Sequence, residues 1–203
     1  MKRLMIVTCL ALTALGAGCN STDRTAALQQ KGPPPAAPDH VPLPTPVKPL
    51  GQLPAEATIN RSSDEDRVKA LETYFQGNSG AAVAADAVSV PAGSVSASGS
   101  FHDVHHKVSG SAKIIGTGNK AKLVLSNDFS TEWGPDLRVV VSGNADPKTA
   151  GDVHEGAYAD LGPIQGTSGA QVFDLSGVNV ADIKSISIYC KPFMVVFGSA
   201  PVK

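Results

Sequence analysis

Residues 185–198, SISIYCKPFMVVFG, decide the fold class of this chain. Within them Ile186, Ile188 and Cys190 alternate with two serines and a tyrosine, which is the two-residue period of a β-strand with one apolar face. Pro192 cannot donate a hydrogen bond to a sheet ladder, so it interrupts the strand just after the cysteine. The stretch therefore predicts a strand that ends near Cys190, with this side chain on the same face as the two isoleucines.

The same period recurs upstream, and turn residues separate the segments that carry it. Apolar residues alternate with basic ones over 120–125 and around Arg138 in 137–141. Gly-Pro or Gly-Asn pairs mark turns at 134–135, 143–144 and 162–163. No helix of core length interrupts this pattern, and roughly 100 residues suffice for one domain. We therefore predict an all-β fold over residues 99–203, a single β-sandwich or flattened barrel of about eight strands.

The N-terminus has the three parts of a bacterial lipoprotein signal. Residues 1–3 contain two basic side chains, and residues 4–15 form an apolar stretch. Residues 16–18 are small and directly precede Cys19. The apolar stretch is too short to span a bilayer. Gly16 stands where this signal usually has Leu, which leaves plain secretion as the alternative. We predict that residues 1–18 are removed and that lipid, such as palmitate, is attached to Cys19.

A lipid on Cys19 would anchor the protein in a membrane of the cell envelope. Asn20 and Ser21 follow, without the Asp that commonly retains a lipoprotein in an inner membrane, so we expect the outer membrane or cell surface. Nine prolines lie between Gly32 and Pro54. In polyproline II geometry these residues would reach on the order of 70 Å. We predict that residues 19–60 are a Pro-rich disordered linker.

A short helix is predicted over residues 61–77. Ser62 and Glu65 have the spacing of a capping box, and Val68, Leu71 and Phe75 recur at helical spacing. Residues 78–98 are mostly Ala, Ser, Gly and Val, which predicts a flexible connector before the β domain.

The charge and the cysteine content of the chain limit the kinds of partner and of thiol chemistry that we expect. The chain has 17 basic and 18 acidic residues, and no cluster of Lys and Arg that could neutralise phosphates. Nucleic acid is therefore not an expected partner. Of the three cysteines, Cys9 lies in the removed leader and Cys19 is acylated, so Cys190 would be the only thiol of the mature protein.

The β domain also resembles a known family, the DM-thirteen domain. The resemblance rests on blocks that occur in order at residues 99–101, 106, 109–112, 123–129, 134–139, 161–166, 169–171, 186–193 and 195–198. It implies a β-rich extracytoplasmic domain with one characteristic cysteine, which falls on Cys190. It also implies a proposed electron-transfer role, in a family found beside DOMON modules and b-type cytochromes.

Two interpretations of Cys190 follow from the residues themselves. A lone cysteine on an apolar face is usually a small buried hydrophobe. A redox role needs a thiolate that a partner can reach, and Pro192 favours access by placing Cys190 near a strand end. Lys191 is adjacent but points to the opposite face of a regular strand.

No cofactor is required, and copper or haem is the alternative. A blue-copper site uses one Cys, two His and a weak axial Met. Cys190 and Met194 could supply two ligands, with the histidines drawn from His102, His106, His105 and His154. Of these, His102 and His106 would share a strand face, with His105 on the other face. An exposed polar strand edge explains these histidines equally well.

Polar side chains in two further loops are weaker candidates. Asp128, Glu132, Trp133 and Asp136 suggest either a calcium loop or a tight turn. Gln171, Asp174 and the loop 166–169 suggest either surface contacts or solvated turn residues.

Motifs of hydrolases, transferases and nucleotide-binding enzymes are missing, which favours a non-enzyme. Two functions remain. The first is a membrane-anchored redox module that uses Cys190 with an envelope redox protein. The second is a cell-surface binding or adhesion module in which Cys190 packs the core.

Overall fold

The computed structural model of this protein describes Leu53 and residues 55–203. The predicted leader, Cys19 and most of the predicted Pro-rich linker lie outside the described residues. Within the described part of the chain, no helix is long and apolar enough to cross a membrane.

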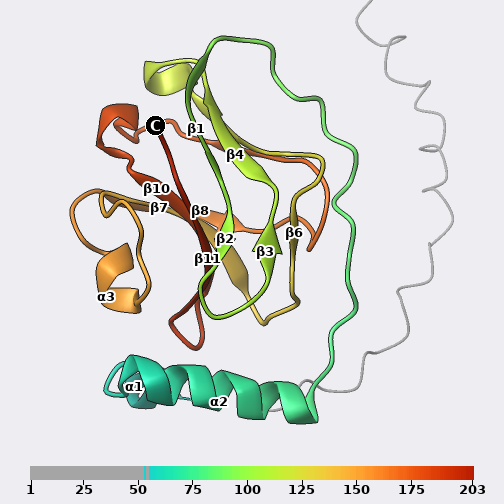
Figure 1. The fold of residues 1–203 in the computed structure, drawn as a ribbon, viewed down its shortest axis with the longest axis vertical. Helices are drawn as coiled ribbons and strands as arrows, with labels where there is room; N and C mark the ends of the chain where they lie inside the picture. Colours follow the sequence, from blue (N-terminus) through green and yellow to red (C-terminus); the bar gives the residue numbers. More distant parts are fainter. Residues whose placement is uncertain (1–52, 54) are drawn as a thin grey trace, which may run out of the picture. The chain divides into compact units, whose positions relative to one another are not determined.

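In the described part of the chain, eleven antiparallel strands form three sheets, which confirms the all-β prediction (Figure 1). The first sheet has the order β1 (Val95–Ser100), β4 (Ser111–Ile115), β5 (Lys122–Leu125), β9 (Gln171–Asp174). The second has the order β2 (His102–Asp103), β11 (Val195–Pro201), β10 (Ser185–Cys190), β7 (Leu137–Ser142), β8 (Tyr158–Pro163). The third pairs β3 (Val108–Ser109) with β6 (Ser130–Thr131). The prediction of about eight strands matches the longer ones, because β2, β3 and β6 have two residues each.

The two large sheets enclose one apolar core. Leu123 and Leu125 of the first sheet and Ile186, Ile188 and Phe197 of the second are fully buried and belong to the same cluster. None of the sheets, as described over residues 95–201, closes into a barrel. The sandwich alternative of the prediction is therefore the one that the structure adopts.

The second face of β10 is also buried, which the alternation in the sequence did not predict. Ser185 and Ser187 alternate with the apolar residues and lie on this second face, and both are fully buried. The segment that contains α3 (Ala150–Val153) packs a second apolar cluster on this face, and Tyr189 belongs to that cluster. Ser185 donates a hydrogen bond to the Asn144 carbonyl over 2.7 Å, which satisfies its buried hydroxyl.

Helix α2 (Asp64–Gly77) occurs where a helix was predicted, but a different pair of residues caps it. The capping side chain is Ser63, which accepts from the Asp66 backbone N–H over 3.2 Å. The predicted cap, Ser62, instead donates to the Thr58 carbonyl and so closes the preceding turn, which includes α1 (Glu56–Ile59). Leu71 is fully buried, so the helix contributes to the core.

The β-fold begins earlier than the predicted domain boundary at residue 99. Strand β1 starts at Val95, inside the predicted connector. Farther upstream, the Thr167 N–H donates to the Val83 carbonyl over 2.6 Å, and the Ala85 N–H donates to the Ser168 carbonyl over 2.7 Å. Small side chains let this part of the connector approach the loop backbone closely enough to form these bonds.

Candidate functional site

Cys190 is the last residue of β10, as the sequence predicted, but it is not accessible. It pairs with Leu137 of β7 on one side and Val195 of β11 on the other. Its side chain faces the main core with Ile186 and Ile188, and the residue is 0% exposed. The expectation that a strand end would improve access is therefore wrong. β7 and β11 both begin at the residues that pair with Cys190, but side chains from outside these strands, including Tyr74 and Phe193, complete the buried cluster around it.

The surroundings of Cys190 keep its thiol protonated. Burial raises its pKa to about 12, and the nearby Asp136 carboxylate acts in the same direction. A hydrogen bond from the Phe193 backbone opposes this shift but does not overcome it. The thiol itself donates to the Pro135 carbonyl over 3.2 Å. Since the thiolate is the nucleophilic form, this cysteine is a poor nucleophile in the folded protein.

Aromatic rings from α2 and from the loops of the domain gather next to this thiol. Tyr74 packs against Phe193 with ring centroids 5.4 Å apart, and it stacks on Trp133 at 6.4 Å and 15°. Phe75 contacts Trp133 at 5.8 Å and meets His106 edge-on at 5.4 Å. Burial raises the pKa of Tyr74, and electrostatic interaction with the thiol raises it further. We call Tyr74, Phe75, Trp133, His106 and Phe193 the aromatic cluster.

No pattern in the sequence indicates this cluster, because its members are far apart in the chain. Of its members in α2, Phe75 was identified only through its helical spacing with Val68 and Leu71. In the folded protein the Tyr74 hydroxyl and His106 Nε2 are buried and have no hydrogen-bond partner among the described residues. Such groups are uncommon in folded proteins and mark positions where water or a transient partner can bind.

The histidines proposed as copper ligands do not come together. Each has a separate partner: His102 with Asp146 at 2.8 Å, His106 with Glu132 at 3.0 Å, His105 with the Lys148 carbonyl at 3.3 Å, and His154 with the Ala150 carbonyl at 2.7 Å. Across Leu53 and residues 55–203, no three His, Cys, Asp or Glu side chains are placed to hold a metal ion. The residues therefore do not fit a blue-copper site. The predicted shared face for His102 and His106 is also lost, because β2 ends at Asp103.

In the two loops with polar side chains, the candidate residues Asp136, Gln171 and Asp174 have structural partners within the domain. Asp136 lies in a tight turn with a φ of 44°, and its carboxylate pairs with Arg138, so the turn interpretation holds there. Gln171 is fully buried, and its side chain donates to the Gly166 carbonyl over 2.7 Å. Asp174 pairs with Lys122 over 2.6 Å, and this hydrogen bond lowers its pKa to about 2. The connector covers the loop 166–169, so this loop is not an open surface.

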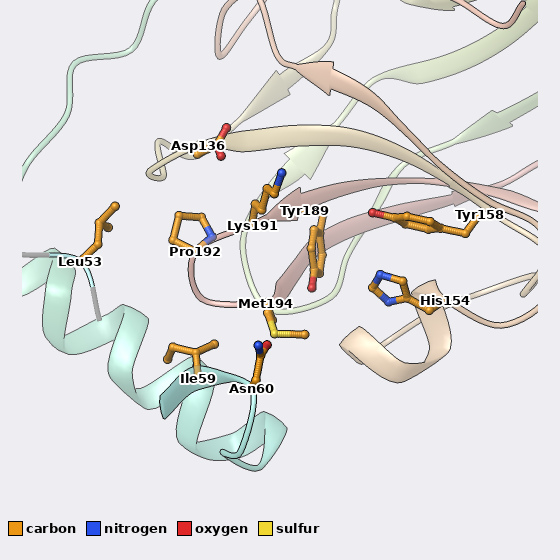
Figure 2. A pocket seen from close by; sticks show the side chains of 10 residues that line it. All are labelled: Leu53, Ile59, Asn60, Asp136, His154, Tyr158, Tyr189, Lys191, Pro192 and Met194. Carbon is orange, nitrogen blue, oxygen red and sulfur yellow. The ribbon is translucent and has the colours of Figure 1, made fainter. Parts of the chain in front are cut away.

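A pocket of about 440 Å³ lies on the other side of β10 (Figure 2). Tyr189 enters it from the strand, Pro192 and Met194 from the turn that follows, and Ile59 from α1. His154 lies at one end of the pocket. The volume falls in the range of small-molecule sites. No pattern in the sequence indicates this pocket.

Comparison with known protein families assigns the chain to a family. A family model described as electron transfer DM13 matches residues 100–202, which is just over half of the chain. The chain belongs to the DM13 electron-transfer family. This confirms the resemblance seen in the sequence. No curated protein and no solved structure matches the chain.

The DM13 match begins at residue 100, so α2 lies outside it. The helix nevertheless places Leu71 and Tyr74 in the core of the domain. The cover over the Cys190 side of the core is thus built partly from residues that the DM13 family model does not include.

Proposed function

We propose that this protein is a lipid-anchored module of the cell envelope whose DM13 domain exchanges electrons with an envelope redox protein. The observation that carries the proposal is the DM13 match over residues 100–202, which spans nearly the whole β-fold. The anchor is the lipid on Cys19, in the outer membrane or at the cell surface. The Pro-rich linker gives the domain the reach to meet its partner.

We assign the redox role to Cys190, acting through the aromatic cluster and not as an exposed nucleophile. Its thiol is protonated and fully buried, so a partner cannot form a disulfide with it in this conformation. Tyr74 and Trp133 provide a series of short ring contacts away from the thiol. In this scheme the thiol gives one electron to an oxidised cofactor of the partner and one proton to solvent, and the return of both restores it.

Protein-film voltammetry of the full chain tests the redox role. We expect a reversible one-electron wave from the native protein and none from Cys190→Ala. Ser187→Ala is the matched control, because Ser187 is an equally buried small residue on the other face of the same strand. The proposal fails if the native chain gives no wave, or if Cys190→Ala leaves the wave unchanged.

Metabolic labelling with an alkyne palmitate tests the anchor independently. We expect the native chain and Cys9→Ser to incorporate the label and to remain in the membrane fraction. Cys19→Ser should lose both properties. Equal labelling of native protein and Cys19→Ser would rule out the anchor without affecting the redox test.

A cell-surface binding or adhesion module is the second candidate. The complete burial of Cys190 favours it, because a core cysteine needs no chemical role. On this alternative, Cys190→Ala changes only the free energy of unfolding, by about 1–3 kcal/mol, and no voltammetric wave is seen.

A further inference from the structure

A tyrosine that is otherwise buried presents its hydroxyl group, without a partner among the described residues, to the pocket beside β10. Tyr189 is 4% exposed, and its hydroxyl forms no hydrogen bond with Leu53 or residues 55–203. Figure 2 shows the hydroxyl directed toward Asn60 and Met194, into the pocket. Burial raises the pKa of Tyr189 above its usual range, so the group remains a neutral O–H. An unpaired hydroxyl in such a place is available to a ligand.

His154 provides the complementary group. Its Nδ1 lies 2.7 Å from the Ala150 carbonyl, and because a carbonyl only accepts, Nδ1 carries the proton. In the neutral imidazole, Nε2 is then a hydrogen-bond acceptor. The His154 ring lies against Tyr158 with centroids 4.3 Å apart, and it meets Tyr189 edge-on at 6.4 Å. The pocket therefore offers one donor and one acceptor next to aromatic rings.

The remaining lining residues select a neutral ligand with an apolar body. Ile59, Pro192 and Met194 give apolar contact, and a thioether packs well against an aromatic ring. Asp136 and Lys191 also line the pocket, and their opposite charges favour neither an anion nor a cation.

We propose that this pocket binds a neutral aromatic ring that bears a hydroxyl group, the class of phenols and hydroquinones. The ligand hydroxyl accepts a hydrogen bond from Tyr189 and donates one to His154 Nε2, while the ring lies on the apolar lining. The site is separate from the redox proposal, since it lies across β10 from the Cys190 thiol and requires no electron transfer.

Ligand-observed fluorine NMR of the full chain tests the site with 4-fluorophenol as the probe. We expect its resonance to broaden on addition of protein. The probe 4-fluoroanisole, which cannot donate to His154, should bind about tenfold more weakly, as should the anion 4-fluorobenzoate. One hydrogen bond is of this size, since a tenfold change in affinity corresponds to about 1.4 kcal/mol.

Tyr189→Phe removes only the pocket hydroxyl and should weaken 4-fluorophenol binding about tenfold. Tyr74→Phe is the matched control, because it removes a buried, unpartnered hydroxyl from the aromatic cluster instead. The site is refuted if 4-fluorophenol binds no better than 4-fluoroanisole, or if the two tyrosine variants bind it equally. The voltammetry that tests the redox proposal uses no added ligand, so its outcome does not depend on these binding measurements.

Discussion

The reactivity of Cys190 toward a thiol reagent is the most direct consequence of its setting. The structure raises its pKa from an ordinary 9.0 to about 12. At neutral pH this lowers the thiolate fraction about 1,000-fold, because each pKa unit changes it tenfold. The residue is also 0% exposed, so a reagent must wait for the structure to open. Both effects slow alkylation.

The assay compares Cys190 with an exposed thiol in the same tube. Ser94→Cys adds that thiol at an exposed position on the connector, before β1. The full-chain variant is treated with iodoacetamide near neutral pH, and peptide mass spectrometry follows each cysteine separately. We expect Cys190 to react at least 1,000-fold more slowly than position 94, and to react at a comparable rate in denaturant. Native rates within tenfold of each other would refute both the burial and the raised pKa.

Three further outcomes follow from the packing. Because Cys190 keeps its proton to higher pH when folded than when unfolded, its stabilising effect is complete below pH 9 and declines between pH 9 and 12. Between pH 9 and 10.5, the free energy of unfolding in urea should therefore fall by about 2 kcal/mol more for the native protein than for Cys190→Ala. An equal fall in the two proteins would contradict this. Leu71→Ala should cost about 2–5 kcal/mol in the same assay, against less than about 0.5 kcal/mol for the exposed Glu72→Ala; similar losses would mean that α2 is not part of the domain. In Gly166→Ala the new Cβ would lie 2.4 Å from the Ala85 nitrogen and would displace the connector from the loop 166–169. We therefore expect limited proteolysis to cleave the connector faster in this variant. Unchanged cleavage would show that the connector does not cover this loop.

The local patterns in the sequence predicted the strands well because each depends on neighbouring residues. The alternation of Ile186, Ile188 and Cys190 correctly placed these side chains on one face. It could not show that Ser187 would be buried on the other face, because the α3 segment that covers this face lies more than thirty residues away in the chain. A polar residue in a strand indicates solvent only when nothing packs on that face.

The candidate site was predicted less completely than the fold. Cys190 was correctly singled out as the only thiol of the domain, but its exposure depends on Leu137, Val195 and the rings of α2. The histidine pattern suggested a shared metal site, and each ring found its own partner instead. Neither the aromatic cluster nor the pocket at Tyr189 has a signature in the sequence, since both join residues from separate elements.

The sequence by itself determined the all-β class, the DM13 family and the position of Cys190 at the end of a strand, since periodicity, turn residues and motif order are properties of the chain read locally. Only the tertiary structure decided that this thiol is shielded and protonated, that α2 completes its cover, and that the Tyr189 hydroxyl opens into a pocket. The physical reason is that exposure and pKa depend on which distant side chains exclude water from a group, and sequence order does not specify those contacts.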